Sequence, residues 1–243
     1  MKEKKRLDLI VHERYPQYSR QQIQSWIMQG LVTVNDKVVA KPGVATPVDA
    51  VLMLNNDEPK YVSRAGYKLE KALEAFGIDV HGLVVLDAGL STGGFSDCLL
   101  QQGAKKIYGI DVGYGQVHEK ISNDPRVDVR ERTNLRHLES VGEPVDLVTL
   151  DLSFISVLKV MDAVNAVLKQ DGALVILIKP QFEARKHDIG RGGIIKDSAV
   201  HERVVKEVVD GVTAHGFVCQ GVIESPIEGT HGNKEFLAYF LKK

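Results

Sequence analysis

The sequence predicts an α/β protein: a mainly parallel sheet preceded by a small N-terminal α+β domain. Apolar strands alternate with helical patterns from residue 83 onward, which is typical of a parallel sheet with helices on both faces. One buried strand runs directly into a glycine-rich turn at residues 84–97. A separate helix–helix–hairpin pattern lies nearer the N-terminus. We therefore expect two domains, at residues 1–58 and 59–243.

Composition indicates a soluble, cytoplasmic protein. The chain has 243 residues, of which 44% are hydrophobic and 26% charged, as in ordinary globular domains. Its longest apolar run, Ala173–Ile178, is far shorter than the roughly 20 residues that cross a bilayer. Cys98 and Cys219 form no CxxC pair, and the histidines show no ligand spacing. We expect no membrane segment and no bound metal.

Basic charge is concentrated near the N-terminus. Residues 1–64 contain ten Lys and Arg against seven Asp and Glu, a net charge of +3, whereas the remainder contains 21 against 25, a net charge of −4. The total of −1 does not by itself suggest a nucleic-acid-binding protein. The distribution favours an N-terminal module that faces phosphates.

The N-terminal elements can be read from capping and turn residues. Ser19–Gln22 has the pattern of a capping box, and a helix with an apolar face follows and stops at Gly30. Leu31–Val34 is a strand candidate, Asn35–Asp36 a turn, and Val38–Val39 the returning strand. A further strand, Val51–Leu54, precedes a polar linker at residues 55–59.

This order, with the words "YSRQQIQSWIMQGLVTVNDKVV", resembles the RNA-binding domain first described in a ribosomal small-subunit protein. The resemblance covers roughly residues 4–54. It implies that Arg6, Arg20 and Lys37 contact RNA phosphates. The alternative is that these three residues form an ordinary solvated surface.

The larger domain begins with a helix that we expect to be capped at Ser63 and to end at Gly77. Strand candidates follow at regular intervals, with helical patterns between most of them. They are Leu83–Asp87, Lys106–Asp111, Val127–Arg130, Asp146–Asp151, Ala173–Lys179, Gly216–Ile223 and Glu235–Phe240.

The first turn of this sheet reads D-x-G-x-x-x-G-G, from Asp87 to Gly94. It lacks both the G-x-G-x-x-G spacing and a P-loop lysine. It is similar to the first motif of S-adenosylmethionine methyltransferases, a Rossmann-like fold, which implies this cofactor. Asp111, 24 residues after Asp87, can accept both ribose hydroxyls, and Asn134 would lie near the adenine. The expected cofactor-binding residues are Asp87, Gly89, Ser91, Thr92, Gly93, Gly94, Phe95, Asp111 and Asn134. Alternatively, each acid merely caps the segment that follows it.

Charged residues also stand at other ends of apolar strands. Asp151 and Lys179 end two strands, Glu235 opens another, and Lys68 lies in the first turn of the preceding helix. Because such positions cost desolvation energy unless the charges are paired, these residues are candidates for catalysis. Structural ion pairs are the alternative for each of them. Glu183 is an alternative acid to Glu235.

Together, Lys68, Asp151, Lys179 and Glu235 resemble the Lys-Asp-Lys-Glu tetrad of the FtsJ-like RNA 2′-O-methyltransferases. The words "SRAGYKL", "DAGLSTGGFSD", "LDLSFIS", "LIKPQFE" and "SPIEGTHGNKEF" are similar to the TlyA group, formerly labelled hemolysins, which methylate ribosomal RNA riboses. The resemblance spans nearly the whole chain. One departure is that Ala184 leads to Arg185 and Lys186, where the group usually has a glycine and then an arginine.

The resemblance implies a class I methyltransferase sheet and methyl transfer from S-adenosylmethionine to a 2′-hydroxyl of ribosomal RNA, with ribosomal RNA or subunits as partners. Lys179 would lower the pKa of the hydroxyl or take its proton, Asp151 would orient Lys179 and the methyl donor, and Glu235 would fix Lys68 and the ribose. A non-catalytic RNA-binding ribosome-assembly factor would need a broken cofactor loop or tetrad. A membrane-lysing hemolysin is disfavoured, since the chain has no spanning segment.

Overall fold

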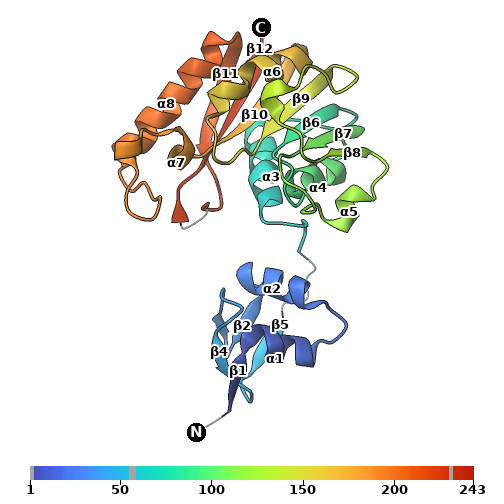
Figure 1. Ribbon diagram of the computed structural model, residues 1–243, viewed down its shortest axis with the longest axis vertical. Helices are drawn as coiled ribbons and strands as arrows, with labels where there is room; N and C mark the ends of the chain where they lie inside the picture. The colour runs from blue at the N-terminus through green and yellow to red at the C-terminus, as the bar shows by residue number, and fades with distance from the viewer. Residues whose placement is uncertain (1–2, 55–58, 230–231) are drawn as a thin grey trace. The chain divides into compact units, whose positions relative to one another are not determined.

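The computed structural model describes residues 3–54, 59–229 and 232–243 (Figure 1). The chain divides into two compact units, Met1–Lys60 and Tyr61–Lys243. Residues 55–58 of the expected linker lie outside the described residues. The boundary between residues 58 and 59 therefore stays a prediction.

The N-terminal unit is a small α+β domain. Its elements are β1 (Lys4–Arg6), α1 (Leu7–Arg14), α2 (Arg20–Met28), β2 (Val32–Val34), β3 (Lys37–Val38), β4 (Ala45–Pro47) and β5 (Leu52–Leu54). The capping box at Ser19 is confirmed, because the Ser19 side chain accepts from the Gln22 backbone amide and the Gln22 side chain accepts from the Ser19 backbone amide. Asn35 and Asp36 have φ values of 48° and 62°, so the predicted tight turn is also confirmed.

Two antiparallel sheets form in this unit. One has the order β3-β2-β5, and its strands and turn match the predicted hairpin. The other pairs β1 with β4, which the sequence did not predict. Leu7, Ile23 and Ile27 are fully buried between the helices and the strands.

The larger unit alternates strands and helices along most of its length (Figure 1). Its elements are α3 (Ala65–Phe76), β6 (Val84–Ala88), α4 (Gly94–Gln101), β7 (Lys106–Ile110), α5 (Glu119–Ser122), β8 (Val127–Arg130), η1 (Leu135–His137), β9 (Val145–Leu150), η2 (Val157–Val160), α6 (Met161–Val167), β10 (Leu168–Ile178), α7 (Pro180–Glu183), η3 (Lys186–Asp188), α8 (Ser198–Ala214), β11 (Phe217–Glu224) and β12 (Phe236–Lys242).

The large sheet has the order β11-β12-β10-β9-β6-β7-β8. Strands β8, β7, β6, β9 and β10 are parallel, whereas β12 runs antiparallel between β10 and β11. The predicted mainly parallel sheet is confirmed. Because ligands of such sheets bind beyond the carboxyl ends of the strands, the site is to be sought at that edge.

Hydrophobic cores cover both faces of this sheet. Helices α3 and α4 pack against Val85 and its neighbours on one face, and α6 and α8 pack against Val84 and Leu86 on the other. The alternation along β6 is that of a strand buried on both sides. The two faces of the sheet are thus covered by different helices.

The start of α3 differs from the prediction. The residue before the helix is Arg64, which makes no side-chain capping bond, so Ser63 is not the cap. The Ser63 hydroxyl instead lies 2.2 Å from the position that a Cβ on Gly94 would occupy. Ser63 therefore packs against the glycine-rich turn. The helix ends as predicted at Gly77, whose φ is 65°.

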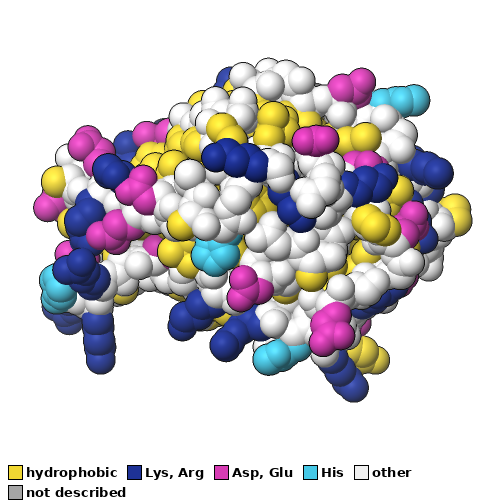
Figure 2. All heavy atoms as spheres, turned by 90° about the horizontal axis from the view of Figure 1, so that it is seen from above, with side chains coloured by type: hydrophobic (Ala, Val, Ile, Leu, Met, Phe, Trp, Pro, Cys, Tyr) yellow, Lys and Arg dark blue, Asp and Glu magenta, His cyan; other side chains and the backbone are white. Residues whose placement is uncertain are grey.

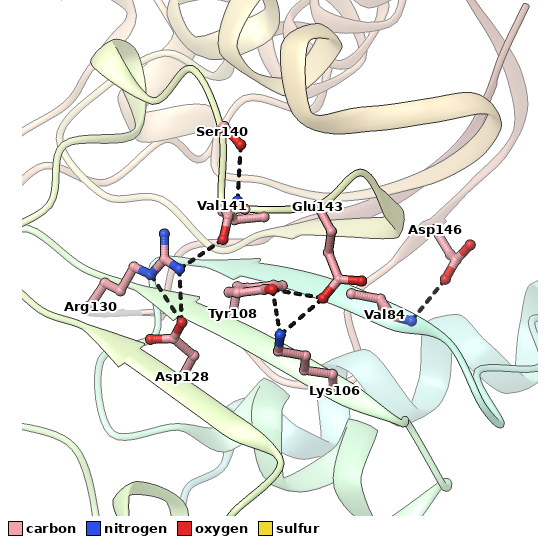
Figure 3. Close-up of polar contacts among 10 residues, drawn as sticks. Val84, Lys106, Tyr108, Asp128, Arg130, Ser140, Val141, Glu143 and Asp146 are labelled. Carbon is pink, nitrogen blue, oxygen red and sulfur yellow. Dashed lines mark hydrogen bonds and ion pairs between the residues drawn. The ribbon is translucent and has the colours of Figure 1, made fainter.

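A polar network secures the sheet beside β7 and β8 (Figure 3). The Tyr108 hydroxyl donates to Glu143 at 2.8 Å, and the Lys106 ammonium donates to both. Arg130 donates to the Val141 carbonyl at 2.8 Å. These bonds anchor the segment between η1 and β9 to strands β7 and β8.

The face of the molecule seen in Figure 2 offers no simple charge signal. Basic, acidic and hydrophobic side chains are intermixed across the face shown in Figure 2. Within the described ranges, no helix combines the length and apolar character needed to cross a bilayer.

Candidate active site

A cavity of about 450 Å³ lies at the carboxyl edge of the large sheet. Its walls come from the segments after β6, β7, β8 and β9, together with residues of η1 and η2. They are Gly89, Ser91, Ile110, Asp111, Val112, Gly113, Gln116, Thr133, Asn134, Leu135, Asp151, Leu152, Ser153, Phe154, Ile155 and Val160. This size and mixture of apolar and polar groups suit a nucleoside-sized ligand.

Asp111 joins two of the walls. One carboxylate oxygen accepts from the Ser91 amide at 2.8 Å, and the other accepts from the Gly113 amide at 2.6 Å. The carboxylate thus holds the glycine-rich turn against the segment after β7. Since Asp111 also lines the cavity, it stands where an acid can bind ribose hydroxyls.

Asp87 lies beneath the cavity and is not among its lining residues. The side chain is fully buried, and its oxygens accept from the Ser96 hydroxyl at 2.7 Å and the Thr149 hydroxyl at 2.9 Å. Burial raises the pKa of Asp87 to about 6, although both hydroxyls act to lower it. Asp87 therefore does not line the cavity itself, and its part in cofactor binding stays a prediction. Asp87 acts on the turn through Ser96, on α4.

The glycines of the turn allow close packing. A Cβ on Gly89 would lie 2.3 Å from the Asp151 carbonyl oxygen. Gly93, with a φ of 93°, would bring its Cβ within 2.7 Å of Ile121. Gly89 lines the cavity, whereas Gly93 and Gly94 do not. The last two are needed at least to pack the turn against α5 and the segment before α3.

Of the remaining residues expected to bind the cofactor, two line the cavity and two do not. Ser91 and Asn134 line the cavity. Asn134 also caps η1, because its side-chain oxygen accepts from the Arg136 amide at 3.1 Å. Thr92 is exposed but does not line the cavity, and Phe95 is buried in the core beside α3.

The four candidate catalytic residues form two ion pairs. The Lys68 ammonium lies 2.5 Å from the Glu235 carboxylate, with 10% and 3% of the side chains exposed. The Lys179 ammonium lies 2.5 Å from an Asp151 oxygen and donates to the Ser153 hydroxyl at 3.0 Å. Each lysine therefore has its own acid, and Asp151 and Ser153 line the cavity.

Strand register brings the two pairs to the same edge. Ile178 of β10 lies opposite Phe236 of β12 in an antiparallel pair. The next position on β10 is Lys179 and the preceding position on β12 is Glu235, so these residues leave adjacent strands at adjacent points. The neighbouring parallel strand β9 ends just before Asp151.

Two phenylalanines were missed by the sequence analysis. Phe154 is 89% exposed, lines the cavity and has a φ of 65°, a strained value for this residue type. Its ring lies 4.9 Å from that of Phe182. Each stands three residues after a tetrad member, Asp151 or Lys179, and that spacing could have drawn attention to them.

Glu183 is engaged elsewhere. Its carboxylate accepts from the Val157 amide at 2.8 Å, and burial raises its pKa. It ties α7 to the start of η2. Glu235, which meets Lys68, is thus the better candidate for the fourth tetrad position. Among the described side chains, no group of three or more His, Cys, Asp or Glu is placed to hold a metal ion.

In the N-terminal unit, Arg6 and Arg20 share one acid. Asp8 is fully buried and accepts from Arg6 at 2.9 and 3.0 Å and from Arg20 at 3.1 Å. The Arg6 bonds, with further donation from Gln24, hold the pKa of Asp8 well below its usual range. The two arginines, each about half exposed, therefore have a structural role besides any contact with phosphate. Lys37 is exposed on β3.

Comparisons with known proteins match both units. Residues 61–242 match the FtsJ-like methyltransferase family, and residues 5–45 match the S4 domain. The 16S/23S rRNA (cytidine-2′-O)-methyltransferase TlyA of Mycobacterium tuberculosis is 41% identical over 242 residues, 98% of this chain and 90% of that protein. Hemolysin A of Brachyspira hyodysenteriae is 41% identical over 240 residues, 97% of this chain and 99% of that protein.

Solved structures agree with this result. A protein of Streptococcus thermophilus described as a hemolysin has 38% identity and a TM-score of 0.78, covering 100% of this chain and 90% of that chain. A SAM-dependent methyltransferase from Aquifex aeolicus, 22% identical, has a TM-score of 0.53 over 77% of this chain and 95% of that chain, which shows the fold alone. The expected class I methyltransferase fold is confirmed. The chain belongs to the FtsJ-like methyltransferase family and groups with TlyA and hemolysin A.

Proposed function

We propose that this protein transfers a methyl group from S-adenosylmethionine to a ribose 2′-hydroxyl of ribosomal RNA. The observation that carries the proposal is the Lys179–Asp151 ion pair at 2.5 Å, beside a nucleoside-sized cavity. The FtsJ-like family and the named activity of the TlyA relatives support it. The intact tetrad geometry favours an enzyme over a non-catalytic RNA-binding assembly factor.

The residues of the cavity suit the cofactor. The Asp111 carboxylate is placed to accept ribose hydroxyls, and Val112, Leu135 and Ile155 offer apolar surface to a purine ring. Val112 is 71% exposed, so its side chain is free to contact a planar ring. The cofactor supplies an already activated methyl group on a sulfonium. The protein's own task is therefore to bind, align and activate the acceptor hydroxyl.

Lys179 is the group best placed to activate that hydroxyl. Asp151 and Ser153 hold its ammonium at the edge of the cavity, at 2.5 and 3.0 Å. A positive charge fixed beside the 2′-oxygen stabilises the negative charge that develops there, and so lowers the pKa of the hydroxyl. Glu235 leaves β12 next to the point where Lys179 leaves β10, so the Lys68–Glu235 pair would help to fix the ribose.

The exposed Phe154 ring gives the acceptor a platform. Bases that leave a stacked helix commonly stack on aromatic side chains, and Phe154 with Phe182 presents such a surface beside Lys179. The N-terminal unit would then supply phosphate contacts through Arg6, Arg20 and Lys37. This division agrees with the positive charge of residues 1–64.

The test is the chemistry of the product. Wild-type protein, Lys179→Ala and the control Lys71→Ala, at an exposed lysine of α3, are incubated with labelled S-adenosylmethionine and unmodified ribosomal subunits. We expect wild type and control to produce a nucleotide that resists alkaline cleavage, because its 2′-oxygen is methylated. Lys179→Ala should yield almost none. A methylated base, or full activity without Lys179, would refute the proposed reaction.

A further inference from the structure

We infer that Asn233 is a positioning residue that fastens the glycine-rich loop 190–195 to the segment carrying Glu235. The inference rests on the proposed function, since it concerns the geometry of the same site. Asn233 is only 3% exposed, although asparagine is usually found at the surface. Its contacts explain why it is buried.

The Asn233 side chain bonds to the loop at two points. Its amide oxygen accepts from the Ile195 amide at 3.1 Å, and its amide nitrogen donates to the Gly193 carbonyl at 3.0 Å. A side-chain amide can both accept and donate in this way, whereas a carboxylate can only accept. Replacement by aspartate would therefore keep the shape but lose the bond to Gly193.

The loop needs such a fastening. Gly192 and Gly193 have φ values of 80° and 77°, and glycine-rich segments lose much conformational entropy when ordered. Bonds from the Gly190 amide to the Ile194 carbonyl, at 3.0 Å, and from the Gly193 amide to the Gly190 carbonyl, at 3.1 Å, close the loop on itself. Asn233 attaches this loop to the rest of the unit, and Arg191 is exposed on it.

Asn233 also sets the surroundings of Glu235, two residues further along. Its carbonyl accepts from the Gly229 amide at 2.8 Å. A Cβ on Gly229 would lie 2.0 Å from a Glu235 carboxylate oxygen, so the Gly229 backbone covers that carboxylate. The backbone of Asn233 thus holds the segment that covers the buried Lys68–Glu235 pair, and its side chain ties that segment to the loop.

The two excursions of the chain form a closed ring. One leaves the sheet at Lys179 and reaches the loop, and the other returns to the sheet at Glu235. The β10–β12 register joins them at the base, through Ile178 and Phe236. Asn233 joins them a second time, away from the strands. Loss of this second joint should loosen the geometry between the two tetrad pairs.

The test compares Asn233→Ala and Asn233→Asp with wild type and with Asn165→Asp. Asn165 donates to the His215 carbonyl at 3.0 Å near the other end of β10, so it controls for loss of a partly buried amide. Two quantities are measured: the methylation rate constant at saturating ribosomal substrate and cofactor, and the rate of tryptic cleavage after Arg191 and Lys196.

Both Asn233 variants should lower the rate constant by about 10- to 100-fold, the cost of misplacing reacting groups by up to about 1 Å. Cofactor affinity should stay near the wild-type value, and cleavage within the loop should accelerate. The Asn165 variant should match wild type in each respect. Asn233→Asp, which keeps the Ile195 bond, remains informative should Asn233→Ala fail to fold.

The possible failures are distinguishable. An inactive wild type would refute the proposed function, while the cleavage rates would still test the fastening. An active wild type with equally active Asn233 variants would refute the positioning role. Unchanged cleavage in the variants would show that Asn233 does not hold the loop.

Discussion

The Lys68 ammonium and the Glu235 carboxylate, 167 residues apart in the chain, meet at 2.5 Å in a site almost closed to water. Removing one charge of such a buried pair leaves the other charge uncompensated, whereas removing both can be nearly neutral for stability. Stability and catalysis can therefore be separated by removing one partner or both.

Lys68→Met or Glu235→Gln alone should destabilise the protein by about 3 to 5 kcal/mol, because the remaining charge stays buried without its partner. The double variant should regain most of that stability but no methyl transfer. Denaturant unfolding and product assays check this, with Lys71→Ala as a control on the exposed side of α3. A double variant that recovers activity would exclude both residues from the reaction.

Asp111→Asn should weaken S-adenosylmethionine binding by about 10- to 100-fold, the usual cost of losing hydrogen bonds to a charged group. The substitution also replaces one oxygen that accepts from the Ser91 or Gly113 amide by a donor. Calorimetry measures the change, and Asp128→Asn, which alters only the surface pair with Arg130, is the matched control. Equal affinities in both variants would place the nucleoside elsewhere.

Asp87 should make stability depend on pH in an unusual direction for an acid. Its folded pKa of about 6 exceeds the ordinary value of 3.8, so the folded state binds its proton more tightly. The associated stability is full below about pH 4 and is lost as the pH rises through 6, at about 1.4 kcal/mol per pH unit. Asp87→Asn should remove this slope in unfolding measurements from pH 4 to 7. An identical slope in the variant would contradict the assignment.

The N-terminal unit requires a careful choice of variants. Lys37→Ala should lower RNA affinity and reduce the salt dependence of binding by about one charge, without changing the melting temperature. Arg20→Ala should lower both affinity and melting temperature, because Asp8 loses a partner. Adding Asp8→Asn should lower the melting temperature further, because Arg6 and Gln24 then also lose their charged acceptor. Should Lys37→Ala bind RNA like wild type, the hairpin is not part of the RNA surface.

The sequence predicted the large strands well because local signals agree with the tertiary structure there. The strand predicted at Val127–Arg130 coincides with the observed strand, and Gly77 and Ser19 act as expected. The β1 strand, Lys4–Arg6, escaped because its basic residues have low strand propensity and pair only through the distant β4. Its existence depends on tertiary contacts.

The candidate site was predicted in part for the same reason. Charged residues at apolar strand ends are visible in sequence, so Asp151, Lys179 and Glu235 could be named, while Lys68 on α3 joined them as a tetrad through the family resemblance. The burial of Asp87 and Asp8 could not, since each depends on hydroxyls or cations brought in from elsewhere. The cavity walls at Val112 and Thr133 were also missed, because neither residue type marks a site by itself.

Strand β12 lies between β10 and β11 in the sheet but follows both in the chain, so this part of the sheet is completed late in synthesis. A ribosome adds about 5 to 20 residues each second, so Glu235 follows Lys68 by roughly 10 to 30 s. Until then β10 lacks its antiparallel neighbour, and the Lys68 ammonium lacks its acid. Under the proposed function, which places this pair in the reaction, methyl transfer has to wait until β12 is inserted beside β10.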